Sequence, residues 1–255
     1  AVAKYEIFLG AELTGTSPMH AFTADGLSPN TEYSFTVRAL DASGNRSEAS
    51  APLVIKTTSN ATFYSLASGN LNELPSWRKN ADGTGDIPQN FSDNGQFFVI
   101  SNRTNTSIGG SWTVGGNSSR VIIPAGVTVT ADSAFSGNVE LEGNSTLNLS
   151  HATAPTLVRL APESTVNFVE YPTVEANTYG HIILSGTAMK TFDGDTIDVL
   201  GNVTVHDGVA LKGSPQNSSF LRIGGNLTVL GARPATAADN SIDLAFINPT
   251  ATITT

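Results

Sequence analysis

Six residues between positions 190 and 207 have side chains suited to acid–base chemistry: Lys190, Asp193, Asp195, Asp198, His206 and Asp207. Carboxylates beside a basic proton acceptor are the groups that enzymes cleaving polysaccharides use. The Asp-Gly-Asp segment at 193–195 also begins like a calcium-binding loop, but the later ligands and the terminal Glu are missing. Alternatively, this segment and the His-Asp-Gly segment at 206–208 are turns with outward polar side chains. We favour the turns and predict no catalytic residue and no metal site.

The other reactive residue types form no motif. The sequence has no Gly-x-Ser-x-Gly, phosphate-loop, His-Glu-x-x-His or dinucleotide-binding pattern. It has no cysteine, which excludes disulfides, thiolate zinc sites and cysteine nucleophiles. The four histidines are far apart in the sequence: His20, His151, His181 and His206. We therefore predict no cofactor.

Four aromatic residues are candidates for a platform on which sugar rings stack: Tyr64, Trp77, Trp112 and Tyr179. Trp112 lies between two glycine pairs, Gly109-Gly110 and Gly115-Gly116, which suits an inward-pointing residue near the end of a stack of strands. We favour the interpretation that the two tryptophans are a cap and a core contact, with the sugar platform as the alternative.

Composition narrows the class of protein. The 255 residues include 13 basic and 22 acidic side chains, and the net charge of −9 argues against nucleic-acid binding. No apolar run reaches about 18 residues, so we predict no membrane-spanning segment. Ser, Thr, Asn and Gly make up 101 residues, whereas charged residues make up 14%. Such a chain suits short strands and turns, and we predict an all-β fold.

Residues 1–58 have the alternation of antiparallel strands. Residues 5–9 and 33–40 alternate between apolar and polar side chains. Between them lies Leu27-Ser28-Pro29-Asn30-Thr31-Glu32-Tyr33, which resembles the Leu-x-Pro-x-Thr-x-Tyr signature of fibronectin type III domains. In that family, Leu27, Pro29, Thr31 and Tyr33 would belong to a tyrosine corner. The resemblance implies the C-terminal half of a β-sandwich, without its first two strands.

Residues 59–120 are rich in turns. Two segments here resemble a sequence motif that precedes a β-solenoid in large surface proteins exported by the bacterial type IX secretion pathway. They are Ser68-Gly69-Asn70-Leu71-Asn72 and Pro75-Ser76-Trp77. We predict a linker and an N-terminal cap here.

Residues 121–255 contain a repeat. The segment from Val139 aligns with the one from Val158 at an offset of 19, and the segment from Val121 aligns at an offset of 18. Gly201-Asn202-Val203-Thr204-Val205 matches a segment 24 residues further on. Units of this length with two or three short strands predict stacked coils of a right-handed parallel β-helix. Val139, Leu141, Leu147 and Leu149 would point inward, and Glu140, Glu142 and Asn148 outward.

The resemblance implies a non-enzymatic part of a large bacterial cell-surface protein, extracellular and exported by the type IX pathway. It would be an adhesin, a gliding-related protein or a structural stalk. Its partners would be the secretion machinery, other surface proteins or glycans. Ser133 and Thr196 fit the short Asp-Ser/Thr-apolar pattern that is O-glycosylated in such proteins. The alternatives are a carbohydrate-active β-helix enzyme or its accessory module, and a building block of a phage tail or an S-layer.

Overall fold

The chain divides into two compact units. The computed structural model describes residues 2–25, 27, 31–57, 61–194, 196–213, 219–231 and 242–255. Residues 1–60 and 93–95 form the N-terminal unit, and residues 61–92 and 96–255 form the solenoid unit. Apart from one 3-10 turn, η1 (Leu74–Ser76), all regular structure in these ranges is β-strand, which confirms the predicted all-β class. None of the helical structure described is long and apolar enough to cross a bilayer.

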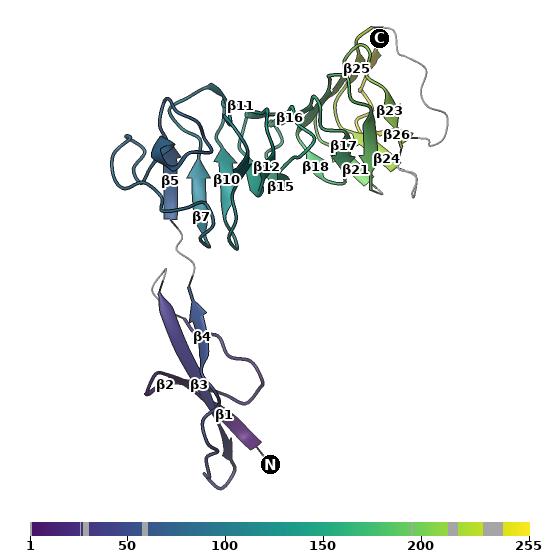
Figure 1. Ribbon diagram of the computed structural model, residues 1–255. Helices are drawn as coiled ribbons and strands as arrows, with labels where there is room; N and C mark the ends of the chain where they lie inside the picture. The colour runs from purple at the N-terminus through teal and green to yellow at the C-terminus, as the bar shows by residue number, and fades with distance from the viewer. Residues whose placement is uncertain are drawn as a thin grey trace. The chain divides into compact units, whose positions relative to one another are not determined.

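The N-terminal unit contains one antiparallel sheet (Figure 1). Its strands, in sheet order, are β2 (Glu12–Ser17), β1 (Val2–Leu9), β3 (Glu32–Asp41) and β4 (Leu53–Lys56). Ile7 pairs with Val37, and Ile7 and Phe35 are the buried apolar side chains in the described part of this unit. All of its described strands belong to this single sheet, so the described residues contain one layer of the predicted sandwich and no second layer.

The Leu-x-Pro-x-Thr-x-Tyr signature precedes β3. Thr31 and Thr57 tie the start of β3 to the end of β4, because each backbone N–H bonds to the other residue (3.0 and 2.9 Å). The rings of Tyr33 and Phe35 lie 6.4 Å apart, and Leu27 is half-buried. Pro29 lies outside the described residues, and the tyrosine corner stays a prediction.

The solenoid unit is a stack of coils, and each coil visits three faces in turn (Figure 1). The first face begins with a six-stranded sheet and continues with a four-stranded one. The six strands are β5 (Ala61–Ser65), β6 (Trp77–Arg78), β7 (Gln96–Val99), β10 (Arg120–Ile123), β13 (Asn138–Leu141) and β15 (Thr156–Leu160). The four strands are β18 (Thr178–Tyr179), β21 (Thr196–Val199), β24 (Ser219–Ile223) and β26 (Ile242–Phe246).

The second face is one continuous eight-stranded parallel sheet. Its strands are β8 (Asn105–Ser107), β11 (Thr128–Ala131), β14 (Thr146–Leu149), β16 (Thr165–Phe168), β19 (His181–Leu184), β22 (Val203–Val205), β25 (Leu227–Val229) and β27 (Ile253–Thr254). The third face has two short sheets. These are β9 (Trp112–Thr113) with β12 (Phe135–Ser136), and then β17 (Thr173–Glu175), β20 (Lys190–Asp193) and β23 (Leu211–Lys212).

The strand register agrees with the repeat offsets read from the sequence. Val121 pairs with Val139, Thr146 with Thr165 and Val203 with Leu227, which are offsets of 18, 19 and 24 residues. The predicted parallel β-solenoid is therefore confirmed. The parallel ladder already includes β5 and β7, so stacked strands begin ahead of residue 121.

Two details of the repeat differ from the sequence alignment. Val139 pairs with Leu157 rather than Val158, because a bulge shifts the register before Glu140 pairs with Arg159. Val158 is the extra residue and is 49% exposed. Glu140, predicted to point into solvent, is 5% exposed because arginines from two other strands cover it.

The solenoid core is continuous from the first coil to the last described ones. Inward residues alternate with outward ones along most of the solenoid strands, and Val139, Leu141, Leu147 and Leu149 are all buried as predicted. One connected cluster of buried side chains extends from Phe63 to Leu227. A single coil leaves its inward side chains uncovered above and below, so this core exists only because coils stack.

Candidate functional site

The six polar residues between 190 and 207 do not form one site in the described structure. Asp193 ends β20 on the third face, Asp198 lies in β21 on the first face, and His206 and Asp207 follow β22 of the second face. Consecutive strands of a coil lie on different faces, so residues near in sequence point to different sides. Asp198 forms an ion pair with Arg222 of the next coil. Asp195 lies outside the described residues.

Among these residues, Lys190 differs most from the outward position expected from the sequence. Its side chain is fully buried, and its Nζ donates to the backbone oxygens of Val169 (2.6 Å) and Tyr171 (3.4 Å). Burial lowers the pKa of the Lys190 amine to about 8, although the negative charge of Glu170 acts in the opposite direction. Lys190 therefore belongs to the core and is not a surface proton acceptor.

The described residues hold no metal site of the usual kind. No group of three or more His, Asp or Glu side chains within them is arranged to hold an ion. Two histidines act locally instead. The Nδ1 of His151 accepts from the N–H of Thr153, and that of His181 from the N–H of Asn202, both at 2.9 Å.

The four aromatic residues do not form an exposed sugar platform. Trp77, Trp112 and Tyr179 are at most 2% exposed, and Tyr64 is half-buried. Trp112 stacks on Phe135 with ring centroids 5.0 Å apart and planes inclined by 4°. Trp77 lies 5.7 Å from Trp112, so the tryptophans form the first layers of the core.

The Ser-Gly-Asn segment at residues 68–72 belongs to the cap that covers the first coil. Leu71 is fully buried, and its backbone oxygen accepts a hydrogen bond from Nε1 of Trp77 at 2.8 Å. Gly69 has a φ of +91°, and a Cβ there would lie 2.5 Å from Oγ of Ser76. This segment resembles the start of a solenoid, and in the structure it lies over the first coil.

Arg103 holds the cap together, and no sequence pattern indicated it. Its guanidinium donates to the backbone oxygens of Leu66, Ser68 and Gly69 and to the hydroxyl of Thr106. Burial lowers the pKa of this guanidinium from its ordinary value. Five donors in a planar fork suit a loop that presents several carbonyls.

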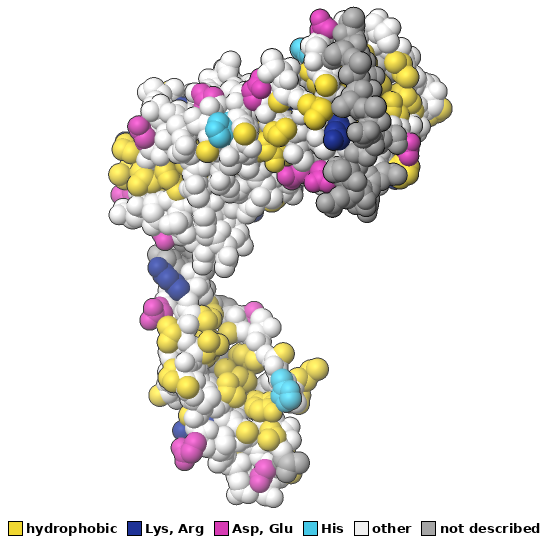
Figure 2. All heavy atoms as spheres, turned by 45° about the vertical axis from the view of Figure 1, so that its right-hand side comes forward, with side chains coloured by type: hydrophobic (Ala, Val, Ile, Leu, Met, Phe, Trp, Pro, Cys, Tyr) yellow, Lys and Arg dark blue, Asp and Glu magenta, His cyan; other side chains and the backbone are white. Residues whose placement is uncertain are grey.

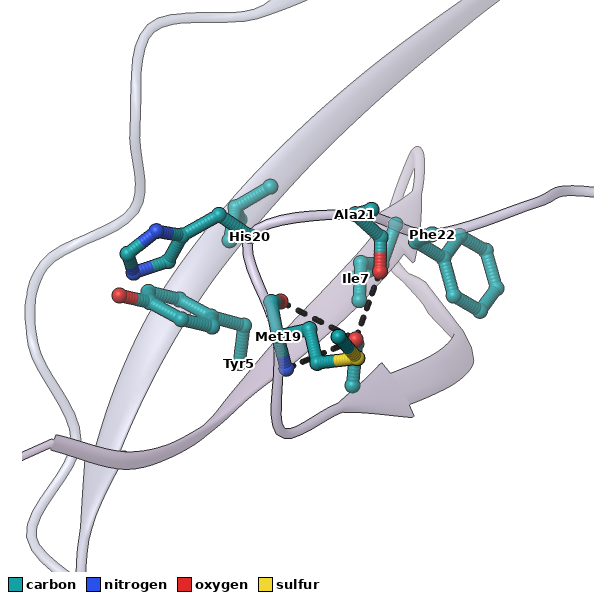
Figure 3. Close-up of a pocket in the computed structure, with 8 residues that line it drawn as sticks. Tyr5, Ile7, Met19, His20, Ala21 and Phe22 are labelled. Carbon is teal, nitrogen blue, oxygen red and sulfur yellow. Dashed lines mark hydrogen bonds between the residues drawn. The ribbon is translucent and has the colours of Figure 1, made fainter.

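The N-terminal unit contains a cavity of about 290 Å³. Figure 3 shows it between β1 and the segment after β2, with Tyr5 and Ile7 on one side and Met19, His20 and Phe22 around it. The ring of His20 meets that of Tyr5 edge-on at 5.3 Å. The described residues that line it include no Asp, Glu, Lys or Arg, so the cavity suits an apolar group rather than acid–base chemistry.

Ser17 shapes the loop that borders this cavity. Its hydroxyl donates to the backbone oxygens of Met19 (3.0 Å) and Ala21 (2.6 Å) and accepts from the N–H of Met19. Hydrophobic side chains gather on the exposed surface of this unit in Figure 2. Met19 is 70% exposed, because the described residues place no second sheet over this face.

Apart from Ile183, the outward side chains of the second face are polar. The strand register aligns them in two columns without Asp, Glu, Lys or Arg: Asn105, Thr128, Thr146, Thr165 and His181, and Ser107, Thr130, Asn148, Asn167, Ile183, Thr204, Thr228 and Thr254. Hydrogen bonds link neighbours along the second column. The amide of Asn148 donates to Thr130 (3.2 Å), and that of Asn167 donates to Asn148 (3.1 Å).

The two predicted glycosylation residues are both half-buried. Ser133 lies in a bend after β11, and Thr196 begins β21, where it pairs with Phe220. Asp195, the acidic residue of the second tripeptide, lies outside the described residues. Modification at Ser133 and Thr196 stays a prediction.

Short stretches of the chain are similar to curated bacterial proteins. One is 45% identical over 56 residues to Exoglucanase B of Cellulomonas fimi, covering 22% of this chain and 5% of that protein. Another is 35% identical over 71 residues to Chitinase A1 of Niallia circulans, covering 28% of this chain and 10% of that protein. Exoglucanase A of Cellulomonas fimi matches over 56 residues, 6% of its length. No family model and no solved structure matches the chain.

These matches support the fibronectin type III-like resemblance of a short part of the chain. The chain spans a tenth or less of the length of these relatives, so the matches carry no information on catalysis in either direction.

Proposed function

We propose that the chain is a non-enzymatic part of a large bacterial cell-surface protein, with the N-terminal unit as a spacer and the solenoid unit as a rigid stalk and adhesion surface. The observation that carries the proposal is the continuous second face, a ladder of eight strands over one unbroken core. A solenoid grows by repetition and offers an extended surface to a partner. The uncharged columns of hydroxyl and amide groups suit a neutral, hydroxyl-rich partner such as a glycan.

Location and export belong to the same proposal. The cap at residues 66–78 resembles the start of solenoids in type IX substrates, which supports an extracellular protein on the bacterial surface. The secretion machinery and other surface proteins are then its partners. The high content of Ser, Thr, Asn and Gly fits a solenoid, because these residues suit the corners and outer faces of coils.

Adhesion can be tested with two matched pairs of substitutions on different faces. Thr146→Lys with Thr165→Lys places two charges on neighbouring strands of the second face, and Thr173→Lys with Thr191→Lys does the same on the third face. All four threonines are half-buried outward residues. Beads coated with each variant would be tested for attachment to bacterial cells and to immobilised glycans. We expect the second-face pair to lose attachment and the third-face pair to keep it, and equal attachment of both would contradict the proposal.

A second candidate function is an accessory module of a carbohydrate-active protein, which the matches to two exoglucanases and a chitinase favour. It predicts retention of the purified chain on cellulose or chitin. An assay for reducing ends released from these polysaccharides separates both proposals from an enzyme, because only an enzyme would release them.

A further inference from the structure

The first solenoid face is interrupted between the coil of β15, β16 and β17 and the coil of β18, β19 and β20, a level that we call the joint. The first-face sheet ends at β15 and a new one begins at β18, whereas the interruption of the third face, between β12 and β17, lies before the joint. The second face, through β16 and β19, and the third face, through β17 and β20, run through this level. Two backbone ladders cross the joint instead of three, so individual side-chain contacts weigh more there.

The corner at residues 169–171 is the crowded part of the joint. The N–H groups of Val169, Glu170 and Tyr171 all donate to the backbone oxygen of Leu149, at 3.0, 2.9 and 3.2 Å. A carbonyl oxygen has two lone pairs, so three donors share an acceptor suited to two. The corner therefore relies on further contacts to keep its shape.

Lys190 supplies those contacts from the next coil. Its buried Nζ donates to the oxygens of Val169 and Tyr171, on either side of Glu170. An uncharged amine has two N–H groups, which these two oxygens satisfy. An ammonium group has three, and the described residues offer the third no acceptor and no ion-pair partner. Burial of an unpaired charge is costly, so the site favours the neutral form.

We propose that Lys190 is a proton-sensitive latch: its uncharged amine closes the joint between the two halves of the solenoid, and protonation of that amine loosens the joint. This proposal does not depend on which partner the solenoid binds. The lowered pKa of Lys190, about 8, is consistent with it.

Other ionisable groups lie at the corner and on the neighbouring strands. They are Glu170 and Tyr171 at the corner, Glu175 on β17, Tyr179 after it, Asp193 on β20 itself and Lys212 on β23. Side chains of these types ordinarily titrate below pH 5 or near pH 10. Burial raises the pKa of Tyr171 and Tyr179 further. A transition between pH 7 and 9 at the joint is therefore assigned to Lys190.

The sign follows from the two states of the amine. In the open joint Lys190 titrates near its ordinary value of 10.5, and in the closed joint near 8. The open state thus binds more protons between these values, and closure is favoured as pH rises. Linkage predicts that the opening constant falls roughly tenfold from pH 7 to pH 9.

Hydrogen exchange on the whole chain tests this. The reporters are the N–H groups of Ser185 and Thr191, which bond to oxygens of Phe168 and Pro172 across the joint. After correction for intrinsic exchange rates, we expect wild-type protection at both to rise about tenfold between pH 7 and pH 9. Lys190→Met should abolish this pH dependence, and Lys212→Met, one coil further on, should leave it intact.

An unchanged pH dependence in Lys190→Met, or none in the wild type, would overturn the proposal. If Lys190→Met fails to fold, NMR titration of the Lys190 Cε and Nζ resonances in the wild type decides. A midpoint near pH 8 supports the latch, and one above pH 10 refutes it.

Discussion

In the N-terminal unit, Tyr5, Ile7 and Val37 lie on one side of a single sheet and border a cavity, whereas in the solenoid unit the inward side chains of every coil meet at a closed centre. Strand β4 shows the contrast most clearly. Leu53 and Val54 point to opposite sides of the sheet and are 62% and 55% exposed. In the solenoid unit, Val139 and Leu147 come from short strands of similar length and are fully buried.

The difference shows where the two architectures obtain their stability. A single antiparallel sheet needs a second layer to bury its apolar face. A coil needs only another copy of itself above and below. We therefore expect substitutions of equal size to cost far more in the solenoid unit than in the described part of the N-terminal unit.

The largest expected effect is that of Trp112→Ala. Trp112 is 2% exposed and lies between Phe135 and Trp77, so its removal leaves a cavity in the first coils. We expect a loss of about 3–5 kcal/mol in the free energy of unfolding, measured by denaturant titration of the whole chain. Val54→Ala is the control in the other unit, with an expected change within about 0.5 kcal/mol. Similar losses for both would remove the contrast between the units.

Glycine substitutions sharpen the same comparison at the level of the backbone. Gly186 has a φ of +75°, and a Cβ there would lie 2.1 Å from the backbone oxygen of Val169 in the coil below. Gly10 has a φ of +60° in the β1–β2 turn, with no atom within 4 Å of such a Cβ. We expect Gly186→Ala to cost about 2–4 kcal/mol and Gly10→Ala about 1 kcal/mol. Equal shifts of the thermal midpoint would show that coil stacking does not restrict this position.

A buried carboxylate in each unit provides a third comparison. Glu140 binds Arg120 (2.8 Å) and Arg159 (2.9 Å), whereas Glu6 binds only Arg46 (2.9 Å) among the described ion pairs. Glu140→Gln leaves two guanidinium groups without their charge partner, and we expect a loss of about 2 kcal/mol. Glu6→Gln should cost about half as much. Denaturant unfolding of both variants at low and high salt measures the two losses in the free energy of unfolding. A larger loss for Glu6→Gln than for Glu140→Gln would contradict the two-arginine arrangement.

The smallest expected effect concerns two exposed turns. The pKa of Asp41 is lowered mainly by a hydrogen bond from the side chain of Asn45, and to a smaller extent by one from its backbone. Hydrogen bonds from Thr84 lower the pKa of Asp82 in the same way. A lowered folded-state pKa contributes stability above the ordinary value of 3.8, and this contribution is lost as pH falls through the folded-state value. We expect Asn45→Ala to raise the pKa of Asp41 toward 3.8 and to leave that of Asp82 unchanged. Carboxyl NMR titration measures both, and an Asp41 titration that does not move would contradict the assignment.

Local patterns in the sequence were enough to predict much of the fold. The alternation in residues 33–40 and the offsets of 18, 19 and 24 residues predicted an antiparallel sheet and stacked parallel coils, and the strand register confirms the offsets. These predictions succeed because side chains alternate across a strand and because equivalent residues of a repeat pack on one another. The bulge at Val158 was missed, since Leu157 and Val158 are both apolar and either one fits the inward position opposite Val139.

The sequence by itself therefore determined the two kinds of strand pairing, the inward residues of the coils and the buried place of the tryptophans. Only the tertiary structure decided which polar residues meet. It separated Asp193, Asp198 and His206 onto three faces, buried Glu140 between arginines of two other strands, and placed the amine of Lys190 against the corner at residues 169–171. The physical reason is that burial of apolar side chains follows a local period, whereas a polar contact depends on which coil lies above and on where its corner turns.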